Sequence, residues 1–516
     1  MKLKNKLYIE LIFLIILGVL TSFSLPPFNY LLINFFTFSL FFLFLIKKSN
    51  QNKSRKIFFL YGWLFGFGYF FASLYWISIA LTFDKNFDFL IPLTLFLIPS
   101  LLAISYGFVS VFFFILKPKK VVSSLLVFSL IFGVIEFIRG LIFTGFPWNL
   151  IVYSFSSQLE FLSIISIIGT YGLNLFCISL FASPAILIFK DTKKDIRIFI
   201  FFITTFVLFW IYGFSYKENF NKIQKSNYDF NLRIVSSNIS IDRFYSNANS
   251  VLIIEELIKI SNPDEKEKTI FIWPEGILPE ITQEELIEYS WLFDEKFNDL
   301  HLLVIGINRH SEKNGTKKFF NSLSVYDSKL NLLNSYDKIK LVPFGEFLPF
   351  ENILKNVGLK SLTNNYQSFS EGKKRDIISL DKENFSLKIL PLICYEIIYS
   401  GNLFKNFNFD LIVNISEDGW FGQSIGPEQH FTHSIYRAIE SGKYVLRSAN
   451  NGITAVINPI GIIESRVPLN ESGYIDFNEV RKIQPTVFSK YGNKIFGSII
   501  LLYIFLIFSF NRINDE

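Results

Sequence analysis

Long apolar runs constrain the fold of this 516-residue chain more than any other feature of its sequence. A helix needs about 20 mostly apolar residues to cross a bilayer. Runs close to that length cover residues 8–24, 28–46, 57–82, 88–116, 121–143, 161–189, 198–215 and 494–510. The sequence therefore predicts an integral membrane protein with eight spanning helices. The first run lacks an A-x-A cleavage site and further spans follow it, so we expect it to remain uncleaved.

Charged residues are distributed unevenly along the chain. Residues 1–215 contain 17 Lys or Arg and 7 Asp or Glu, whereas the remaining 301 residues contain 70 charged side chains. The proportion of charged residues in this second part is ordinary for a domain that faces water. A hydrophobic content of 51% excludes a disordered chain, a nucleic-acid-binding scaffold and an ordinary soluble enzyme. We predict seven spanning helices in residues 1–215, a water-facing domain in 216–490, and a last helix with a short tail in 491–516.

Basic residues in the short loops predict the orientation of the chain, because they stay in the cytoplasm. With a cytoplasmic N-terminus, only Lys85 lies in the short outer loops. The inner segments then contain Lys2, Lys4, Lys6, Lys47, Lys48, Lys53, Arg55, Lys56, Lys117, Lys119, Lys120, Lys190, Lys193, Lys194 and Arg197. Residues 216–490 would then lie outside the cytoplasm, on the periplasmic side in a bacterium, and both termini inside.

The water-facing segment alternates short apolar runs with amphipathic stretches, which is typical of a layered α/β domain. The expected strands are 232–239, 269–273, 301–307, 321–326, 386–393, 410–415, 444–448 and 453–457. The expected helices are 250–261, 282–299 and 427–441.

Three polar motifs follow apolar runs of this domain. Glu275 lies in WPEG (273–276), Lys338 and Glu346 lie in YDKIKLVPFGE (336–346), and Cys394 lies in LPLICYE (390–396). In α/β sheets, substrate-binding and catalytic groups gather at strand ends because the sheet holds them while adjoining loops admit substrate. The three motifs are therefore candidates for one active site.

The three residue types suit nucleophilic catalysis. A free thiol has a pKa of about 8.5, so it attacks poorly until a base or a cation increases its thiolate fraction. A glutamate can accept the thiol proton, and a lysine ammonium can stabilise a negative oxygen in a tetrahedral intermediate. The spacing alone leaves a second interpretation open, in which Cys394 is a buried packing residue and Glu275 and Lys338 lie on the surface.

The motifs together resemble a known family. Glu275 in WPE, Lys338 in Y-x-K and Cys394 in CYE are similar, in that order, to the Glu–Lys–Cys triad of the nitrilase superfamily. The segments LVPFGE (341–346), ISEDGWFG (415–422) and RSANNGITAVINPIG (447–461), with the apolar runs, resemble the apolipoprotein N-acyltransferases. The membrane segments FSLPPF (23–28), GWLFGFGYF (62–70) and TGFPW (144–148) are similar to patterns of the same family.

The resemblance implies a fold, an activity and roles for residues. The fold would be a polytopic α-helical membrane domain plus an extracytoplasmic α/β nitrilase-like αββα sandwich. Cys394 would be the nucleophile, Glu275 the general base and Lys338 the oxyanion stabiliser, with Glu346, Tyr395 and Glu396 supporting them.

The activity implied is transfer of an acyl chain from a phospholipid to the N-terminal diacylglyceryl-cysteine of an apolipoprotein, through a thioester. We expect a monomer in the bacterial inner membrane that uses no cofactor, metal or nucleic acid.

Several further residues are candidates for substrate contacts or packing. Where the family has a tryptophan after the first strand, this chain has Phe244 and Tyr245, so Tyr245 is a candidate substrate contact. Further candidate substrate contacts are Trp148, Glu136 and Arg139. Glu136 and Arg139 lie three residues apart in an apolar run, and the alternative for them is a structural ion pair within the membrane. Packing is expected of Cys177 and of four residues of one predicted helix, His430, His433, Arg437 and Glu440.

Two rival functions remain open. The first is a membrane-tethered amidase of nitrilase type that uses water as acceptor, and it predicts release of a free acid or ammonia. The second is a catalytically inactive assembly protein, which the presence of Glu275, Lys338 and Cys394 argues against.

Overall fold

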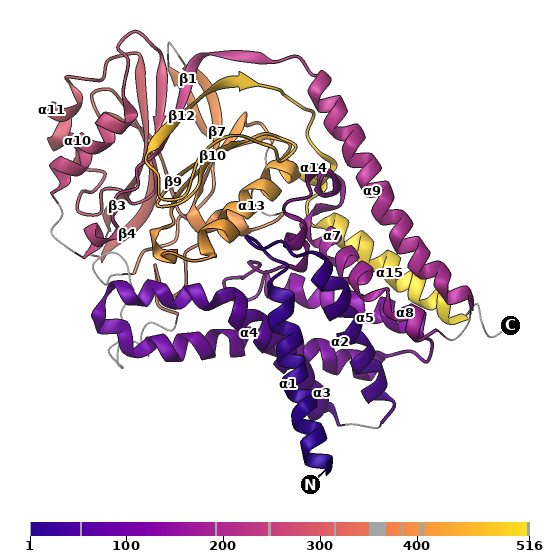
Figure 1. The fold of residues 1–516 in the computed structure, drawn as a ribbon. Helices are drawn as coiled ribbons and strands as arrows, with labels where there is room; N and C mark the ends of the chain where they lie inside the picture. Colours follow the sequence, from indigo (N-terminus) through magenta and orange to yellow (C-terminus); the bar gives the residue numbers. More distant parts are fainter. Residues whose placement is uncertain are drawn as a thin grey trace.

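The computed structural model describes residues 2–51, 54–190, 193–245, 249–313, 316–349, 368–382, 385–401, 403 and 407–512. Two regions are evident in Figure 1. One is a bundle of long helices, here called the helical region. The other is a pair of sheets flanked by shorter helices, here called the sandwich.

The long helices occur where the apolar runs predict them. They are α1 (Lys2–Ser22), α2 (Leu32–Ser49), α3 (Arg55–Leu74), α4 (Ile91–Leu116), α5 (Val121–Arg139), α7 (Ile165–Ala182), α9 (Ile196–Lys222) and α15 (Lys494–Arg512). Among the described residues, seven helical segments are long and apolar enough to cross a membrane, and Leu7–Ser22 is a shorter apolar helix. The chain is thus a multi-pass membrane protein in which α15 returns to the bundle after the sandwich (Figure 1).

Several apolar runs differ from single helices. The run 57–82 ends in a 3-10 segment, η1 (Tyr75–Phe83), and η2 (Lys85–Leu90) precedes α4. The run 161–189 is divided into α6 (Leu159–Leu162), α7 and α8 (Ala185–Ile188), with Gly169 at φ 70° inside α7. Helix α5 ends at Arg139 instead of residue 143, and the chain then forms a loop over residues 140–150. Glycine and proline cause such breaks, because they favour positive φ and lack a backbone donor, respectively.

The sandwich contains two six-stranded sheets. The first has the order β12-β1-β2-β3-β4-β5 and the second the order β11-β10-β9-β8-β7-β6. The first sheet consists of β1 (Ser226–Ser236), β2 (Thr269–Ile272), β3 (His301–Lys313), β4 (Thr316–Asp327), β5 (Leu332–Asp337) and β12 (Gly473–Val480). The second consists of β6 (Ile378–Lys382), β7 (Phe385–Ile393), β8 (Leu411–Glu417), β9 (Tyr444–Asn450), β10 (Thr454–Ile457) and β11 (Ile463–Val467).

The central strands of each sheet are parallel and the outer ones antiparallel. Strands β1, β2 and β3 pair in parallel in one sheet, and β7, β8 and β9 do so in the other. Buried parallel strands are continuous apolar runs, which explains why the sequence revealed them. Strands β5, β6, β11 and β12, which the sequence did not reveal, lie at or beside sheet edges and carry exposed polar residues.

Helices cover the outer faces of both sheets, giving the αββα arrangement. Helix α10 (Ser250–Ser261) and the short α11 (Ser290–Phe293) pack on the first sheet, and α13 (Gly426–Ser441) packs on the second. The helix expected over 282–299 is wrong, because among these residues only η6 (Leu286–Tyr289) and α11 are helical. The chain turns after α11, which buries Phe297 against Phe271 and Phe293.

The core of the helical region continues into the sandwich. Phe38 of α2, Leu173 of α7 and Ile439 of α13 belong to one connected cluster of buried side chains. Helix α13 is therefore one of the elements that join the second sheet to the helices (Figure 1).

Candidate active site

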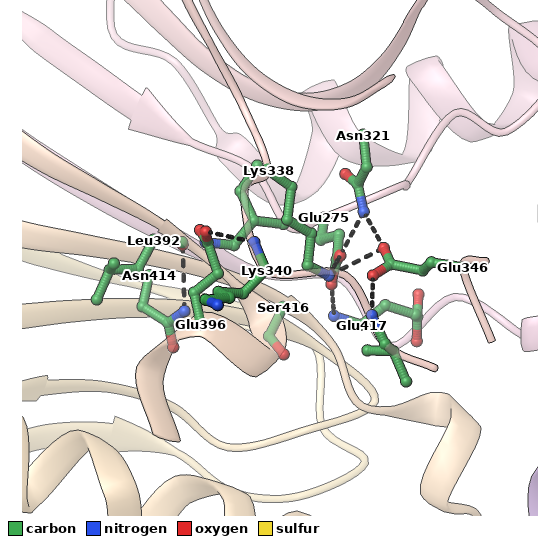
Figure 2. A network of polar contacts seen from close by, with 12 residues as sticks. Glu275, Asn321, Lys338, Lys340, Glu346, Leu392, Glu396, Asn414, Ser416 and Glu417 are labelled. Carbon is green, nitrogen blue, oxygen red and sulfur yellow. Dashed lines mark hydrogen bonds and ion pairs between the residues drawn. The ribbon is translucent and has the colours of Figure 1, made fainter. Parts of the chain in front are cut away.

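The three sequence motifs converge where strands of the two sheets end. Glu275 follows β2, Lys338 directly follows β5, and Cys394 directly follows β7. The Lys338 Nζ atom lies 2.9 Å from Glu275 Oε1 and 2.9 Å from Glu346 Oε1 (Figure 2). All four side chains are buried, and the charges of Glu275 and Lys338 both act on the Cys394 thiol. The arrangement brings a thiol, a carboxylate and an ammonium into one site.

The backbone of Cys394 has an unusual conformation. Its φ is +47°, in the left-handed region of backbone conformation that residues other than glycine rarely adopt. The residue ends the extended run of β7 and begins the 3-10 turn η8 (Cys394–Ile398). A sharp turn of this kind sets a side chain at the edge of a sheet, and strain is tolerated where the surrounding contacts fix it.

Glu396 fixes this turn and the Lys338 loop relative to each other. Its Oε2 atom accepts a hydrogen bond from the Ile393 N–H at 2.9 Å. Its Oε1 atom accepts from the backbone N–H groups of Ile339 and Lys340, at 3.1 and 3.2 Å. The hydroxyl of Tyr336 and the guanidinium of Arg375 also donate to Oε1. Glu396 therefore positions two members of the site without lying between them.

Asn321 of β4 is a site residue that the sequence analysis missed. Its Nδ2 group donates to Glu275 Oε1 at 2.7 Å and to Glu346 Oε1 at 2.8 Å. The other oxygens of the two carboxylates accept from backbone N–H groups, since Glu417 donates to Glu275 Oε2 at 2.9 Å and Val342 donates to Glu346 Oε2 at 2.8 Å. The signal in the sequence was a buried amide within the apolar run FFNSLSV (319–325).

Burial and charge determine the protonation of the site. Burial first, and then the charge of Glu275, raise the pKa of the Cys394 thiol well above its usual value, although Lys338 lowers it. Burial lowers the pKa of Lys338, but the two carboxylates outweigh burial and hold that pKa well above its usual value. Burial and the charge of Glu275 raise the pKa of Glu346. The resting site therefore contains an ammonium and a neutral thiol that needs a base before it can attack.

Comparisons with known proteins identify the family. The family model described as the apolipoprotein N-acyltransferase N-terminal domain matches residues 17–183, and the model described as carbon-nitrogen hydrolase matches residues 296–482. The apolipoprotein N-acyltransferase of Rickettsia prowazekii is 31% identical over 525 residues, which cover 99% of this chain and 100% of that protein. The chain belongs to the apolipoprotein N-acyltransferase family.

Other relatives have the same name. The apolipoprotein N-acyltransferase of Rickettsia bellii is 32% identical over 97% of both chains. Among solved structures, a Saccharomyces cerevisiae member of branch 10 of the nitrilase superfamily is similar to 49% of this chain and 90% of its own, with 16% identity and a TM-score of 0.33. The sandwich has the nitrilase-superfamily fold, and this family member is a multi-pass inner-membrane protein.

In this member of the apolipoprotein N-acyltransferase family, two tyrosines join the turn that begins at Cys394 to the helical region. The Tyr395 hydroxyl donates to the Gly145 carbonyl at 2.9 Å, and the Tyr399 hydroxyl donates to the Thr144 carbonyl at 2.8 Å. Thr144 and Gly145 belong to the loop that follows α5. The turn that carries Cys394 is thus hydrogen-bonded to a loop at the end of a spanning helix.

Glu136 and Arg139 hold this same loop. Arg139 donates to the carbonyls of Phe146 and Asn149, and its Nη2 lies 3.6 Å from Glu136 Oε1. Both side chains are buried, as the alternative of an intramembrane ion pair requires. A direct contact of either residue with substrate stays a prediction.

Trp148 and Tyr245 occupy different surroundings. Trp148 is buried, donates from Nε1 to Gln429 Oε1 at 2.8 Å and stacks on His430 at 5.3 Å between ring centroids. Tyr245 is partly exposed, and its ring centroid lies 6.2 Å from that of Trp420. The ring centroid of Phe244 lies 5.1 Å from that of Trp420. Neither is brought into the Glu275–Lys338 network, and their role as substrate contacts stays a prediction.

The polar residues of α13 are buried, and Arg437 and Glu440 form an ion pair away from solvent. Arg437 Nε lies 2.9 Å from Glu440 Oε2, and Glu440 Oε1 accepts hydrogen bonds from Thr170 N–H and Ser400. His433 packs against Trp148 and Tyr153 of the helical region. Cys177 is fully buried in α7.

Proposed function

We propose that this protein transfers an acyl chain from a phospholipid to the α-amino group of the N-terminal diacylglyceryl-cysteine of an apolipoprotein. Membership of the apolipoprotein N-acyltransferase family supports lipoprotein N-acylation in general. The donor, the thioester and the residue roles are the finer parts of the proposal.

One observation carries the chemistry: the Lys338 ammonium lies 2.9 Å from the Glu275 carboxylate beside the turn that holds Cys394. The position of that turn supports a lipid substrate. Tyr395 and Tyr399 contact the loop after α5, so the turn that carries Cys394 lies near the end of a helix that is long and apolar enough to cross the membrane. A lipid that stays in the bilayer can reach a site close to the membrane more readily than a site far out in the aqueous phase.

In the first step, Cys394 Sγ attacks the ester carbonyl carbon of the phospholipid while its proton passes to Glu275. Lys338 and the Tyr395 backbone N–H stabilise the oxyanion of the tetrahedral intermediate. The C–O bond then breaks, and the leaving alkoxide takes the proton from Glu275. A lysophospholipid departs and a thioester on Cys394 remains.

In the second step, the α-amine of the diacylglyceryl-cysteine attacks the thioester carbonyl. Glu275 accepts a proton from the amine nitrogen, the C–S bond breaks, and the sulfur regains a proton from Glu275. The products are an N-acyl amide and the free thiol. Because the two lipid substrates react in turn, we expect ping-pong kinetics.

We place the sandwich on the periplasmic side of the inner membrane and both termini in the cytoplasm. The support is the excess of Lys and Arg in the loops α2–α3, α4–α5 and α8–α9, which would be cytoplasmic in this orientation.

Mass spectrometry tests the proposal. The purified protein is incubated with a phospholipid of defined acyl chains, and its peptides are searched for an acyl adduct on Cys394. We expect the adduct in the wild type and in Cys177→Ala, whose sulfur is buried in α7, and not in Cys394→Ala.

Two outcomes would contradict the proposal. A wild type without adduct would remove the acyltransferase mechanism, and an adduct that persists in Cys394→Ala would remove the assigned nucleophile. Release of free fatty acid in the presence of an apolipoprotein, without N-acylation, would instead favour the hydrolase that uses water.

A further inference from the structure

A second polar cluster adjoins Cys394, and the mechanism above does not use it. It consists of four buried side chains: Ser416 and Asp418 at the end of β8, His430 of α13 and Arg447 of β9. The Ser416 hydroxyl donates to Asp418 Oδ1 at 2.7 Å. His430 Nδ1 lies 2.9 Å from the same oxygen, and Arg447 Nη2 donates to Asp418 Oδ2 at 2.7 Å.

Sheet register places Ser416 beside Cys394. Strands β7 and β8 are parallel, and Ile393 pairs with Ile415. The next residues along the two strands are Cys394 and Ser416, which therefore reach the carboxyl edge of the sheet at the same level. Side chains alternate between faces along β8, so Ser416 projects to the face opposite Ile415, next to the turn that Cys394 begins after β7. Figure 2 draws Ser416 beside the Glu275–Lys338 network.

The Ser416 hydroxyl has one hydrogen and two neighbouring acceptors. It donates to Asp418 Oδ1, and the second acceptor is the Cys394 sulfur, because Cys394 follows the neighbouring strand at the same register and hydrogen bonding by Ser416 lowers the pKa of its thiol. A hydroxyl can accept from a thiol while donating elsewhere, but it must turn in order to donate to a thiolate. Asp418 can release this hydrogen bond because His430 and Arg447 remain bound to its carboxylate.

We propose that Ser416 is a further catalytic residue, whose hydroxyl donates to Asp418 while Cys394 is a thiol and to the sulfur once the thiol proton has passed to Glu275. Ser416 keeps its own proton throughout, and only the direction of its O–H bond changes. The same movement recurs in the second step, when the sulfur leaves the acyl group as a thiolate. This proposal rests on the proposed function for the identity of the nucleophile.

The charged groups that act on the sulfur come from several elements. Glu275 after β2 and Asp418 after β8 oppose the thiolate, while Lys338 after β5 favours it. Glu346 contacts Lys338, and Arg447 pairs with Asp418 and offsets its charge. Burial lowers the pKa of His430, so this ring is neutral, and its Nδ1 lies 2.9 Å from Asp418 Oδ1 and 3.1 Å from Arg447 Nη2. The Ser416 hydroxyl would thus stabilise the thiolate as an uncharged hydrogen-bond donor, in addition to the positive charge of Lys338.

Alkylation of Cys394 by iodoacetamide across pH 7–10 tests the proposal, because only the thiolate reacts. The readout is the mass of the Cys394 peptide from the full-length protein in detergent. We expect Ser416→Ala to react about 10- to 100-fold more slowly than the wild type at each pH, since a hydrogen bond to a charged group is lost. Ser416→Thr keeps a hydroxyl and should react at nearly the wild-type rate.

Two further variants control for changes in packing. Ser416→Val has the shape of Ser416→Thr without the hydroxyl, so this pair isolates the hydrogen bond. Ser448→Ala removes another buried serine of the same sheet, whose hydroxyl donates to the Val235 carbonyl, and should leave the alkylation rate unchanged. Thermal unfolding of each variant shows that it is folded.

Equal alkylation rates for Ser416→Ala and the wild type, or for Ser416→Thr and Ser416→Val, would overturn the proposal. Alkylation does not depend on acyl transfer. A wild type that forms no acyl adduct would therefore remove the proposed function while leaving the comparison of alkylation rates valid.

Discussion

At the scale of single residues, the site depends on one ammonium shared between two buried carboxylates. Lys338 contacts Glu275 and Glu346, and the Asn321 amide bridges the same two oxygens. Buried carboxylates are costly unless each lone pair finds a donor. Asn321 therefore supplies, without adding charge, a second donor to each of the two oxygens that Lys338 contacts.

Substitution of Asn321 by Leu tests this role. The variant leaves Glu275 Oε1 and Glu346 Oε1 with Lys338 as their remaining donor among these contacts. We expect formation of the acyl-enzyme to slow by about 10- to 100-fold, because hydrogen bonds to charged groups are worth about 1.5–3 kcal/mol. The rate of adduct formation on Cys394 is the measurement. Asn334→Leu, at an exposed position of the adjacent strand β5, should leave that rate unchanged, and an unchanged rate in a folded Asn321→Leu would contradict the role.

The sequence predicted the charged centre because Glu275 and Cys394 each follow a buried apolar strand and Lys338 lies in a polar motif after another apolar run. Glu275, Lys338 and Cys394 could be proposed as one site from that pattern, and Glu346 and Glu396 came from the resemblance to a family. Asn321 and Ser416 could not be found in this way. Each lies within a strand, where a polar residue is equally typical of a solvent-facing position, and only the pairing of strands reveals what it faces.

At the scale of elements, the break in α7 determines how the sandwich meets the helices. Gly169 has φ 70° and ψ 170° inside this helix. The next residue, Thr170, then directs its N–H and hydroxyl to Glu440 of α13. The apolar run 161–189 predicted a single spanning helix, because hydropathy reports the length of a segment and not a backbone turn within it.

Substitution of Gly169 by Ala should destabilise the protein. Its backbone conformation is almost exclusive to glycine, and an added Cβ would lie 2.0 Å from Phe488 Cε2. We expect a loss of about 2 kcal/mol or more in the free energy of unfolding, measured as a lower unfolding temperature in detergent. Gly497→Ala in α15 is the control, because an added Cβ there meets nothing within 4 Å and should not lower that temperature.

At the scale of the whole molecule, the sequence predicted the division into helices and an α/β sandwich more reliably than the boundaries of elements. Apolar runs and charge density identified both regions. The edge strands β5 and β12 and the short helix α11 were missed or misjudged, because edge pairing and local turns depend on neighbours that are distant in the sequence.

Single cysteines introduced at two exposed lysines test the orientation in the membrane. Lys329 lies in the turn between β4 and β5, and Lys119 lies between α4 and α5. We expect a membrane-impermeant maleimide to label Lys329→Cys in intact cells, and to label Lys119→Cys only after the cells are permeabilised. The wild type, whose free cysteines Cys177 and Cys394 are buried, measures the background labelling. The reverse labelling pattern would place the sandwich in the cytoplasm and contradict the proposed function.

Helix α13 has a consequence for protein engineering. Its side chains donate to carbonyl oxygens at three separate places along the chain: Gln429 to Pro26, Tyr436 to Val152 and Arg437 to Ile398. Two of these acceptors belong to the helical region, so the interface is specific as well as apolar. A chimera could combine this sandwich with the helical region of a distant homologue. It would keep these hydrogen bonds only if α13 and the segments that carry its acceptors came from the same protein.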